Sequence, residues 1–203
     1  MVKVEDNKTE ETILEAAKGV FLRKGMFGAR MQEIANDAGI NKSLLHYYYR
    51  SKQLLFEAVF KQAFGLMAPK INDVLNSELE LEEKIKSLTH NYISFVLKHP
   101  YLPGFVIQEL NSNPDFVNTL ITEKHFPNIT VFKKQVEEQV EAGKIKPIDA
   151  NQLFVNILSL TIFPFIANPL LKGFTRLDDE AYNNLLENRK NEVSDFIINA
   201  IKV

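Results

Sequence analysis

The chain has 203 residues, 45% of them hydrophobic, which is enough for one large or two small domains and excludes a disordered protein. It contains no cysteine, which excludes disulfides and thiolate metal sites. The net charge of −2 is uneven: residues 1–52 hold nine Lys or Arg against seven Asp or Glu, and residues 53–203 hold 15 against 19. The basic character is therefore confined to the N-terminal end of the chain.

The N-terminal segment is polar and acidic and lacks the positive start and apolar run of a signal peptide, so we expect a cytoplasmic protein. The first helix should begin at Asn7, with Glu10 in a capping-box relation, and should stop at Gly25. Its apolar face should brace the two helices that follow. That face consists of Ile13, Ala16, Ala17, Val20 and Phe21.

Residues 30–52, RMQEIANDAGINKSLLHYYYRSK, predict a helix-turn-helix. One apolar stripe marks a short first helix and consists of Ile34, Ala35 and Ala38. Gly39 ends that helix through positive φ, and Asn41 is the expected N-cap of a second short helix. Two short helices joined by a tight, glycine-containing turn can place the second helix in a major groove.

The second short helix carries groups that can contact DNA, with Leu45 as its one clear inward anchor. We expect base reading from Lys42, Ser43, Leu44 and Tyr47. We expect phosphate contacts from His46, Tyr48 and Lys52, where Ser51 caps the next helix and leaves backbone N–H groups free. Tyr49 is expected to be structural, and Tyr48 could equally be a core aromatic. The full predicted DNA-binding set is Arg30, Gln32, Asn41, Lys42, Ser43, Leu44, His46, Tyr47, Tyr48 and Lys52.

The pattern IAxxAGI-NKSLLHYYYRSKxxL resembles the DNA-binding segment of TetR-family transcriptional regulators, and ILEAAKGVFLRKGMFGARM resembles the family's first helix. The resemblance extends over residues 9–55, approximately. The chain departs from the usual pattern at Met31, where Thr or Ser is common, at Ser43, where Gly is usual, and at His46, where Tyr is usual. His46 keeps a donor for phosphate. Met31 does not, so Arg30 or Gln32 would have to supply that contact.

The rest of the chain is predicted to be helical. In no segment do apolar and polar residues alternate with period two for long enough to predict a sheet. We expect helices from Lys52 to just before Pro69, over 82–98, between Pro100 and Pro114, around 129–143, from Asp149 onward, and over about 179–202. The fold class is therefore all-α. We expect an N-terminal three-helix helix-turn-helix DNA-binding domain at 1–52 and a larger C-terminal helical ligand-binding and dimerisation domain at 53–203.

Residues 153–171, LFVNILSLTIFPFIANPLL, are long enough and apolar enough to suggest a membrane helix. Pro164, Pro169 and several polar residues interrupt the run, and no cationic residues flank it, so we expect a buried or interfacial helix and no membrane. With the final helix it forms the predicted dimerisation elements at about 149–203, paired in a four-helix bundle. The TetR resemblance implies the same pairing. The alternative is that one face completes the monomer's core.

Aromatic side chains with a few polar neighbours predict a small-molecule pocket in the C-terminal domain. Its expected residues are Tyr92, Phe95, Phe105, Gln108, Phe126, Phe132, Asn156 and Phe163. The resemblance implies a small-molecule effector whose binding moves the two DNA-binding domains of a dimer apart. The ligand should be mostly apolar, because no Arg or Lys lies on those faces. The alternative is that these aromatics are plain core.

Catalysis finds no support in the sequence. The histidines His46, His90, His99 and His125 lack helical partners for a zinc site, so no metal or cofactor is expected. No GxSxG, P-loop or Rossmann glycine pattern is present. The sequence thus predicts a homodimeric TetR-type regulator and no enzyme: a repressor released from a palindromic operator in double-stranded DNA by a small ligand. The alternatives are a DNA-binding regulator controlled by a protein partner, or a helical small-molecule carrier or enzyme.

Overall fold

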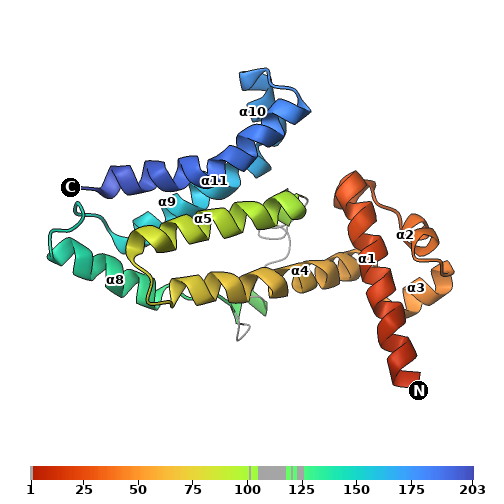
Figure 1. The fold of residues 1–203 in the computed structure, drawn as a ribbon. Coiled ribbons are helices and arrows are strands. Elements are labelled where there is room, and N and C mark those ends of the chain that lie inside the picture. The colour runs from red at the N-terminus through yellow and green to blue at the C-terminus, as the bar shows by residue number, and fades with distance from the viewer. Residues whose placement is uncertain (1, 101, 105–117, 120, 123–125) are drawn as a thin grey trace. The chain divides into compact units, whose positions relative to one another are not determined.

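A computed structural model describes residues 2–100, 102–104, 118–119, 121–122 and 126–203 (Figure 1). These residues form helices joined by short turns, with a single isolated β-bridge among them, between Ile145 and Lys202. The chain divides into two compact units, the first ending at Gly65 and the second spanning Leu66–Val203. The division falls inside one helix, α4 (Lys52–Leu75), whereas the sequence places the domain boundary at the start of that helix.

The N-terminal unit contains α1 (Val2–Gly28), α2 (Met31–Asp37), α3 (Lys42–Tyr48) and the first part of α4. The predicted start of α1 at Asn7 is wrong, because no Gly or Pro precedes Asn7 and the helix extends back to Val2. Gly25 breaks α1 as expected, with a φ of 64° and a ψ of 176°. The apolar face of α1 is buried at Ile13, Ala17, Val20 and Phe21, while Ala16 is partly exposed. The ring of Phe21 packs edge-on against that of Phe56 on α4 at 4.5 Å.

The second unit contains the end of α4, α5 (Leu81–Lys98), α8 (Thr130–Glu141), α9 (Ala150–Ile166), α10 (Asn168–Thr175) and α11 (Asp179–Ile201). α5 packs along α11, and α9 contacts both (Figure 1). As predicted, Asp149 caps α9, its side chain accepting a bond from the Gln152 N–H at 2.9 Å, and Gly143 follows the end of α8 with positive φ. The predicted helix between Pro100 and Pro114 lies almost wholly outside the described residues.

The predicted end of α4 before Pro69 is also wrong, because the helix continues to Leu75. Pro69 removes the helical hydrogen bond to the Gly65 carbonyl. The turns beyond Pro69 compensate by burying Ile71 and Leu75. Their end is held by Lys84, a buried side chain on α5 whose ammonium donates to the Leu75 carbonyl at 3.3 Å. Tertiary contacts therefore outweigh the local helix-breaking effect of the proline.

Among the described helices, no single one has the length and apolar character needed to cross a bilayer. α9 and α10 meet those criteria only when taken together, and they are bent by 79° at the break between them. Pro164 lies inside α9 and Pro169 lies in the first turn of α10, so the prolines fall at the interruption of the apolar run.

Candidate nucleic-acid interface

The turn between α2 and α3 is built as the sequence predicts. Gly39 has a φ of +67°, and the chain reverses there with the Ile40 N–H donating to the Ala35 carbonyl at 3.0 Å. Asn41 caps α3, its Oδ1 accepting a bond from the Leu44 N–H at 2.8 Å. Leu45 is fully buried and fixes the rotation of α3 about its axis. The opposite face of α3 is therefore directed to solvent.

The solvent face of α3 carries the predicted base-reading residues. Lys42, Ser43, Leu44, His46 and Tyr47 are all exposed. Tyr47 is 76% exposed, and its ring lies edge-on to the half-buried Tyr48 ring at 5.5 Å. A core helix would not leave a tyrosine and a leucine in water. The face thus offers a cation, a hydroxyl, an imidazole, a phenol and an apolar group on one surface, which are the contacts that base edges and phosphates accept.

This surface also lacks negative charge. Residues 38–52 include Lys42, Arg50 and Lys52 and no Asp or Glu. The two acidic residues of α2 are paired with cations of α1: Asp37 with Arg23 at 2.6 Å, and Glu33 with Lys24 at 2.9 Å. Because these carboxylates are paired away from α3, repulsion of a phosphate backbone near α3 is reduced. These ion pairs could not be predicted from the sequence, because the partners lie on different helices.

The two predicted contacts on α2 are on its surface. Arg30 is exposed and is the N-cap of α2, but its side chain makes no capping hydrogen bond. The exposed Gln32 amide donates to the Asn36 side chain at 2.9 Å, one turn further along the helix. Arg30 therefore stands at the start of the helix where the resemblance expects a phosphate contact, and its guanidinium can reach outward.

Lys52 has a structural role that the sequence did not reveal. Its ammonium donates to the carbonyl of Phe27, at the end of α1, at 3.2 Å and to that of Ala29, between α1 and α2, at 3.1 Å. Ser51 caps α4 as predicted, its Oγ accepting from the Leu54 N–H at 3.1 Å. Since an ammonium has three N–H donors, Lys52 retains one for a phosphate while it holds the α1–α2 connection in place.

Tyr49 is structural, as expected. It is 8% exposed, and its hydroxyl donates to the Glu10 carboxylate of α1 at 2.9 Å, tying the end of α3 to α1. Burial, followed by the hydrogen bond and the negative charge of Glu10, raises the pKa of the Tyr49 phenol above its ordinary value of 10.0.

We expect a Tyr49→Phe substitution to lower the free energy of unfolding of the N-terminal unit by about 1 kcal/mol at pH 7, because one hydrogen bond is lost. Above pH 10.0 the unfolded chain ionises Tyr49 while the folded chain keeps the proton, so the stability of the natural chain falls as pH rises. The variant should lack this part of the alkaline decline. Urea unfolding between pH 7 and pH 11 would measure both effects, and parallel pH profiles would refute the second.

Among the described residues, those predicted to line the pocket lie in different surroundings. Phe132 is fully buried in the core, 6.1 Å from the ring of Phe154. Tyr92 and Phe154 line a cavity of about 20 Å³, room for little more than a water molecule. Burial raises the pKa of Tyr92 to about 12. Phe95 lies against His99 at 4.5 Å.

The other predicted pocket residues lie elsewhere. Asn156 and Phe163 are exposed on α9, because the buried face of that helix follows Leu153, Ile157 and Thr161 instead. Phe126 is 38% exposed. Phe105 and Gln108 lie outside the described residues. In the part of the chain that the structure describes, no group of His, Cys, Asp or Glu could hold a metal ion.

α9 and α11 leave an apolar surface uncovered. Val155 and Phe163 on α9 are each 52% exposed, and Phe196 on α11 is 65% exposed. Beside Phe196 lies a hollow of about 290 Å³, lined also by Leu160, Arg189, Glu192 and Val193. The Arg189 guanidinium donates to the Leu160 carbonyl, and burial lowers its pKa. Exposed aromatic and aliphatic groups on two packed helices are typical of an interface with another chain.

Comparisons with known proteins agree with this arrangement. The family model for "Bacterial regulatory proteins, tetR family" matches residues 13–59. The chain is 26% identical over 195 residues to the HTH-type transcriptional regulator RutR of Escherichia coli (strain K12), covering 88% of this chain and 85% of RutR. It is also 26% identical over 193 residues to the HTH-type transcriptional repressor NicS of Pseudomonas putida, covering 85% of this chain and 82% of NicS.

The fold also matches a solved structure, that of the transcriptional regulator FadR from Bacillus subtilis in complex with stearoyl-CoA. The TM-score is 0.66 at 17% identity, over 94% of this chain and 98% of that one. The match confirms the predicted all-α fold with an N-terminal helix-turn-helix. The matching family and relatives are transcriptional regulators, which confirms the prediction of a regulator rather than an enzyme.

Proposed function

Because this chain is a DNA-binding transcriptional regulator of the TetR family, we propose that it acts in the cytoplasm as a homodimeric repressor. Each dimer binds a palindromic operator and is released from it by a small, mostly apolar ligand. The observation that carries the proposal is the exposed, carboxylate-free face of α3 beside a fully buried Leu45. That combination presents side chains to a groove and fixes the helix that carries them.

In this proposal the contacts to DNA divide into two kinds. Lys42, Ser43, Leu44 and Tyr47 read base edges in the major groove. The phosphate contacts, which set the position of α3 without reading sequence, come from Arg30, Gln32, Asn41, His46, Tyr48 and Lys52. The half-buried position of Tyr48 and the carbonyl bonds of Lys52 support fixed, sequence-independent roles for these two side chains.

Dimerisation is assigned to the uncovered surface of α9 and α11. Regulators of this family generally act as dimers, and the exposed Val155, Phe163 and Phe196 supply the apolar contacts that such an interface needs. Two copies of one surface related by a twofold axis would bury these groups against each other. The twofold axis also explains why the operator should be a palindrome.

The family and the relatives support release by a small ligand. Regulators of this family generally bind small-molecule effectors, and NicS carries the name of a repressor. FadR has been solved in complex with stearoyl-CoA, whose acyl chain is a long apolar group. For this chain the effector is an apolar molecule that binds the aromatic-rich second unit and favours a dimer geometry with lower operator affinity.

The experiment that tests the proposal is selection of bound duplexes from a random DNA pool at about 0.15 M salt. We expect enrichment of a palindrome whose half-sites are one helical turn apart. Addition of a fatty acyl thioester and of unrelated apolar compounds should then identify an effector, as one that lowers operator affinity. If a folded dimer enriches no sequence, α3 does not read DNA. If no apolar compound shifts binding, control by a small ligand is wrong.

The Lys52→Ala variant tests whether Lys52 positions α3 on the DNA backbone or reads the base sequence. We expect this variant to bind all duplexes more weakly by a similar factor, because one phosphate contact is lost. The slope of the logarithm of the binding constant against the logarithm of the salt concentration should fall in magnitude by about one. The loss of two carbonyl hydrogen bonds should also lower the melting temperature of the N-terminal unit. The exposed Arg50 is a matched control, whose replacement by Ala should leave the melting temperature unchanged. A changed sequence preference in Lys52→Ala would contradict its assignment as a phosphate contact.

A further inference from the structure

One side of α11 carries a stripe of four side chains that is exposed to different degrees along its length. Its members are Leu185, Arg189, Glu192 and Phe196, at intervals of four, three and four residues. Leu185 and Arg189 are partly exposed, and Glu192 and Phe196 are exposed. These intervals keep side chains on one face of a helix and are those of the seam between two packed helices.

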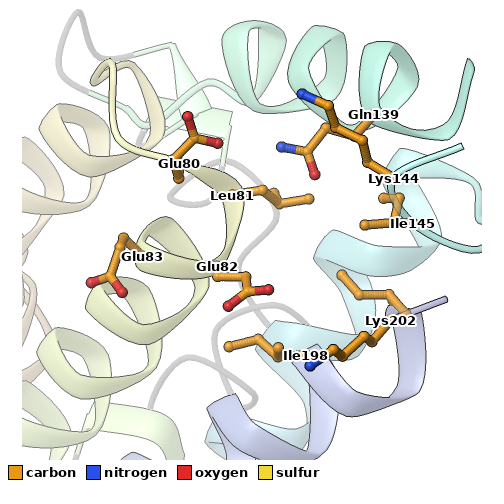
Figure 2. Close-up of a pocket in the computed structure, with 10 residues that line it drawn as sticks. Glu80, Leu81, Glu82, Glu83, Gln139, Lys144, Ile145, Ile198 and Lys202 are labelled. Atoms are coloured by element: carbon orange, nitrogen blue, oxygen red, sulfur yellow. The ribbon is translucent and has the colours of Figure 1, made fainter. Parts of the chain in front are cut away.

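Another side of α11 packs within the same chain. The buried residues of the helix are Tyr182, Leu186, Val193, Ser194, Ile197, Ile198 and Ile201. Near its end, Ile198 lines a hollow together with Leu81 of α5, as Figure 2 shows. These contacts fix the rotation of α11 about its own axis, so the stripe is presented by a helix that is already held in place.

Arg189 is incompletely paired within its own chain. Its guanidinium donates one hydrogen bond to the Leu160 carbonyl of α9. Among the residues that the structure describes, none accepts from the buried Nε–H of Arg189, and neither Arg189 nor Glu192 takes part in an ion pair. A buried N–H of a cation costs free energy when it has no acceptor, and a carboxylate would supply one.

The hollow of about 290 Å³ beside Phe196 has the form of a hole in a seam between helices. Arg189, Glu192, Val193 and Phe196 line it from positions i, i+3, i+4 and i+7 of α11. In knobs-into-holes packing, four residues at these positions receive one side chain from a facing helix. Leu160 of α9 is the fifth lining residue. The hollow is therefore suited to a side chain from a second helix.

We propose that α11 packs antiparallel against α11 of a second copy, with Arg189 paired to Glu192 of the partner subunit. This register presupposes the dimer of the proposed function and specifies which of its residues meet. Antiparallel helices related by a twofold axis bring together residues that lie equally far from the axis on opposite sides. The midpoint between 189 and 192 is also the midpoint between 185 and 196. A single register therefore pairs opposite charges at the centre and places Leu185 against Phe196 on either side.

The order of the stripe, which is apolar, cation, anion, apolar, favours a second copy of this chain as the occupant. Reversed, the stripe is complementary to itself in both charge and apolar character. A parallel pair in register would instead place each Arg189 against another Arg189 and each Glu192 against another Glu192. Like charges facing each other disfavour that arrangement.

The first test reverses the two charges in the full-length chain. Arg189→Glu brings two carboxylates together at both symmetry-related contacts, and Glu192→Arg brings two guanidinium groups together. Sedimentation equilibrium should show dimerisation weakened by about tenfold or more in each single variant. An equimolar mixture of the two variants should regain dimers, and so should the double variant, because both restore opposite charges. Asp195→Arg is the matched control, because Asp195 lies on α11 in a groove beside α5 and should not affect dimerisation.

A second measurement keeps the register testable if a charge variant folds poorly. The chain has no cysteine, so Leu185→Cys and Phe196→Cys chains carry one thiol each. Mixed and mildly oxidised, the two should form a disulfide-linked heterodimer. Either variant alone should not, because its two thiols would lie about 16 Å apart along the seam.

The outcomes separate this register from the dimer on which it rests. Charge variants that dimerise like the natural chain, failure of both combinations to restore dimers, or cross-linking of one cysteine variant with itself would overturn the register alone. A monomeric natural chain would overturn both the register and the dimer of the proposed function.

Discussion

Leu45→Ala should abolish operator binding by unfolding the N-terminal unit. Leu45 is the one fully buried residue of α3, and the loss of its side chain leaves a cavity that costs about 2–5 kcal/mol. The N-terminal unit, which ends at Gly65, has a small core and is therefore expected to be only marginally stable. Circular dichroism should show loss of part of the helix signal at 25 °C while the second unit still melts cooperatively, and gel-shift titration should show no specific complex.

The neighbouring Leu44 is the matched control. It is 36% exposed on the solvent face of α3, so Leu44→Ala should change the free energy of unfolding by less than about 0.5 kcal/mol. In the proposed interface it contacts a thymine methyl, so the variant should bind the natural operator more weakly and discriminate less at that base pair. If Leu45→Ala bound DNA as well as Leu44→Ala, the proposed orientation of α3 would be wrong.

Phe196→Glu should convert the proposed dimer to monomers. Phe196 is 65% exposed, so the substitution has little effect on the folded monomer, but in the proposed interface it would bury an unpaired carboxylate. Without a dimer the two half-sites are bound independently, and operator affinity should fall by about 100-fold or more. Sedimentation velocity at micromolar protein and titration of the operator would measure the two effects.

The control for this prediction is Leu79→Glu, in the turn between α4 and α5. Leu79 is 42% exposed and lies outside the proposed interface, so this variant should remain dimeric and bind the operator normally. A dimeric Phe196→Glu protein, or equal disruption by both variants, would place the subunit interface elsewhere on the molecule.

Most of the helices could be predicted from the sequence because their boundaries depend on local chemistry. Gly25, Gly39 and Gly143 adopt positive φ, and Asn41 and Asp149 cap the helices that follow them. These features need only neighbouring residues. The same holds for the outward face of α3, since a single inward anchor fixes which residues point to solvent.

The predictions failed where contacts between residues far apart in the sequence determine the structure. Helix α4 continues past Pro69 because Lys84, from another helix, holds its end. The second role of Lys52 depends on the carbonyls of Phe27 and Ala29, which lie 25 and 23 residues earlier in the chain. Whether aromatic residues on different helices line one pocket cannot be established from helical spacing, because it depends on how the helices pack.

Pro69 also has a mechanical consequence. The helical bond from residue 69 to the Gly65 carbonyl cannot form, and this missing bond lies next to the division between the two compact units. A helix that lacks one bond of its ladder bends about that point with a smaller elastic cost than an intact one. α4 therefore has a built-in compliant point, and Pro69→Ala would stiffen the only continuous backbone path through which strain in one unit can be transmitted to the other.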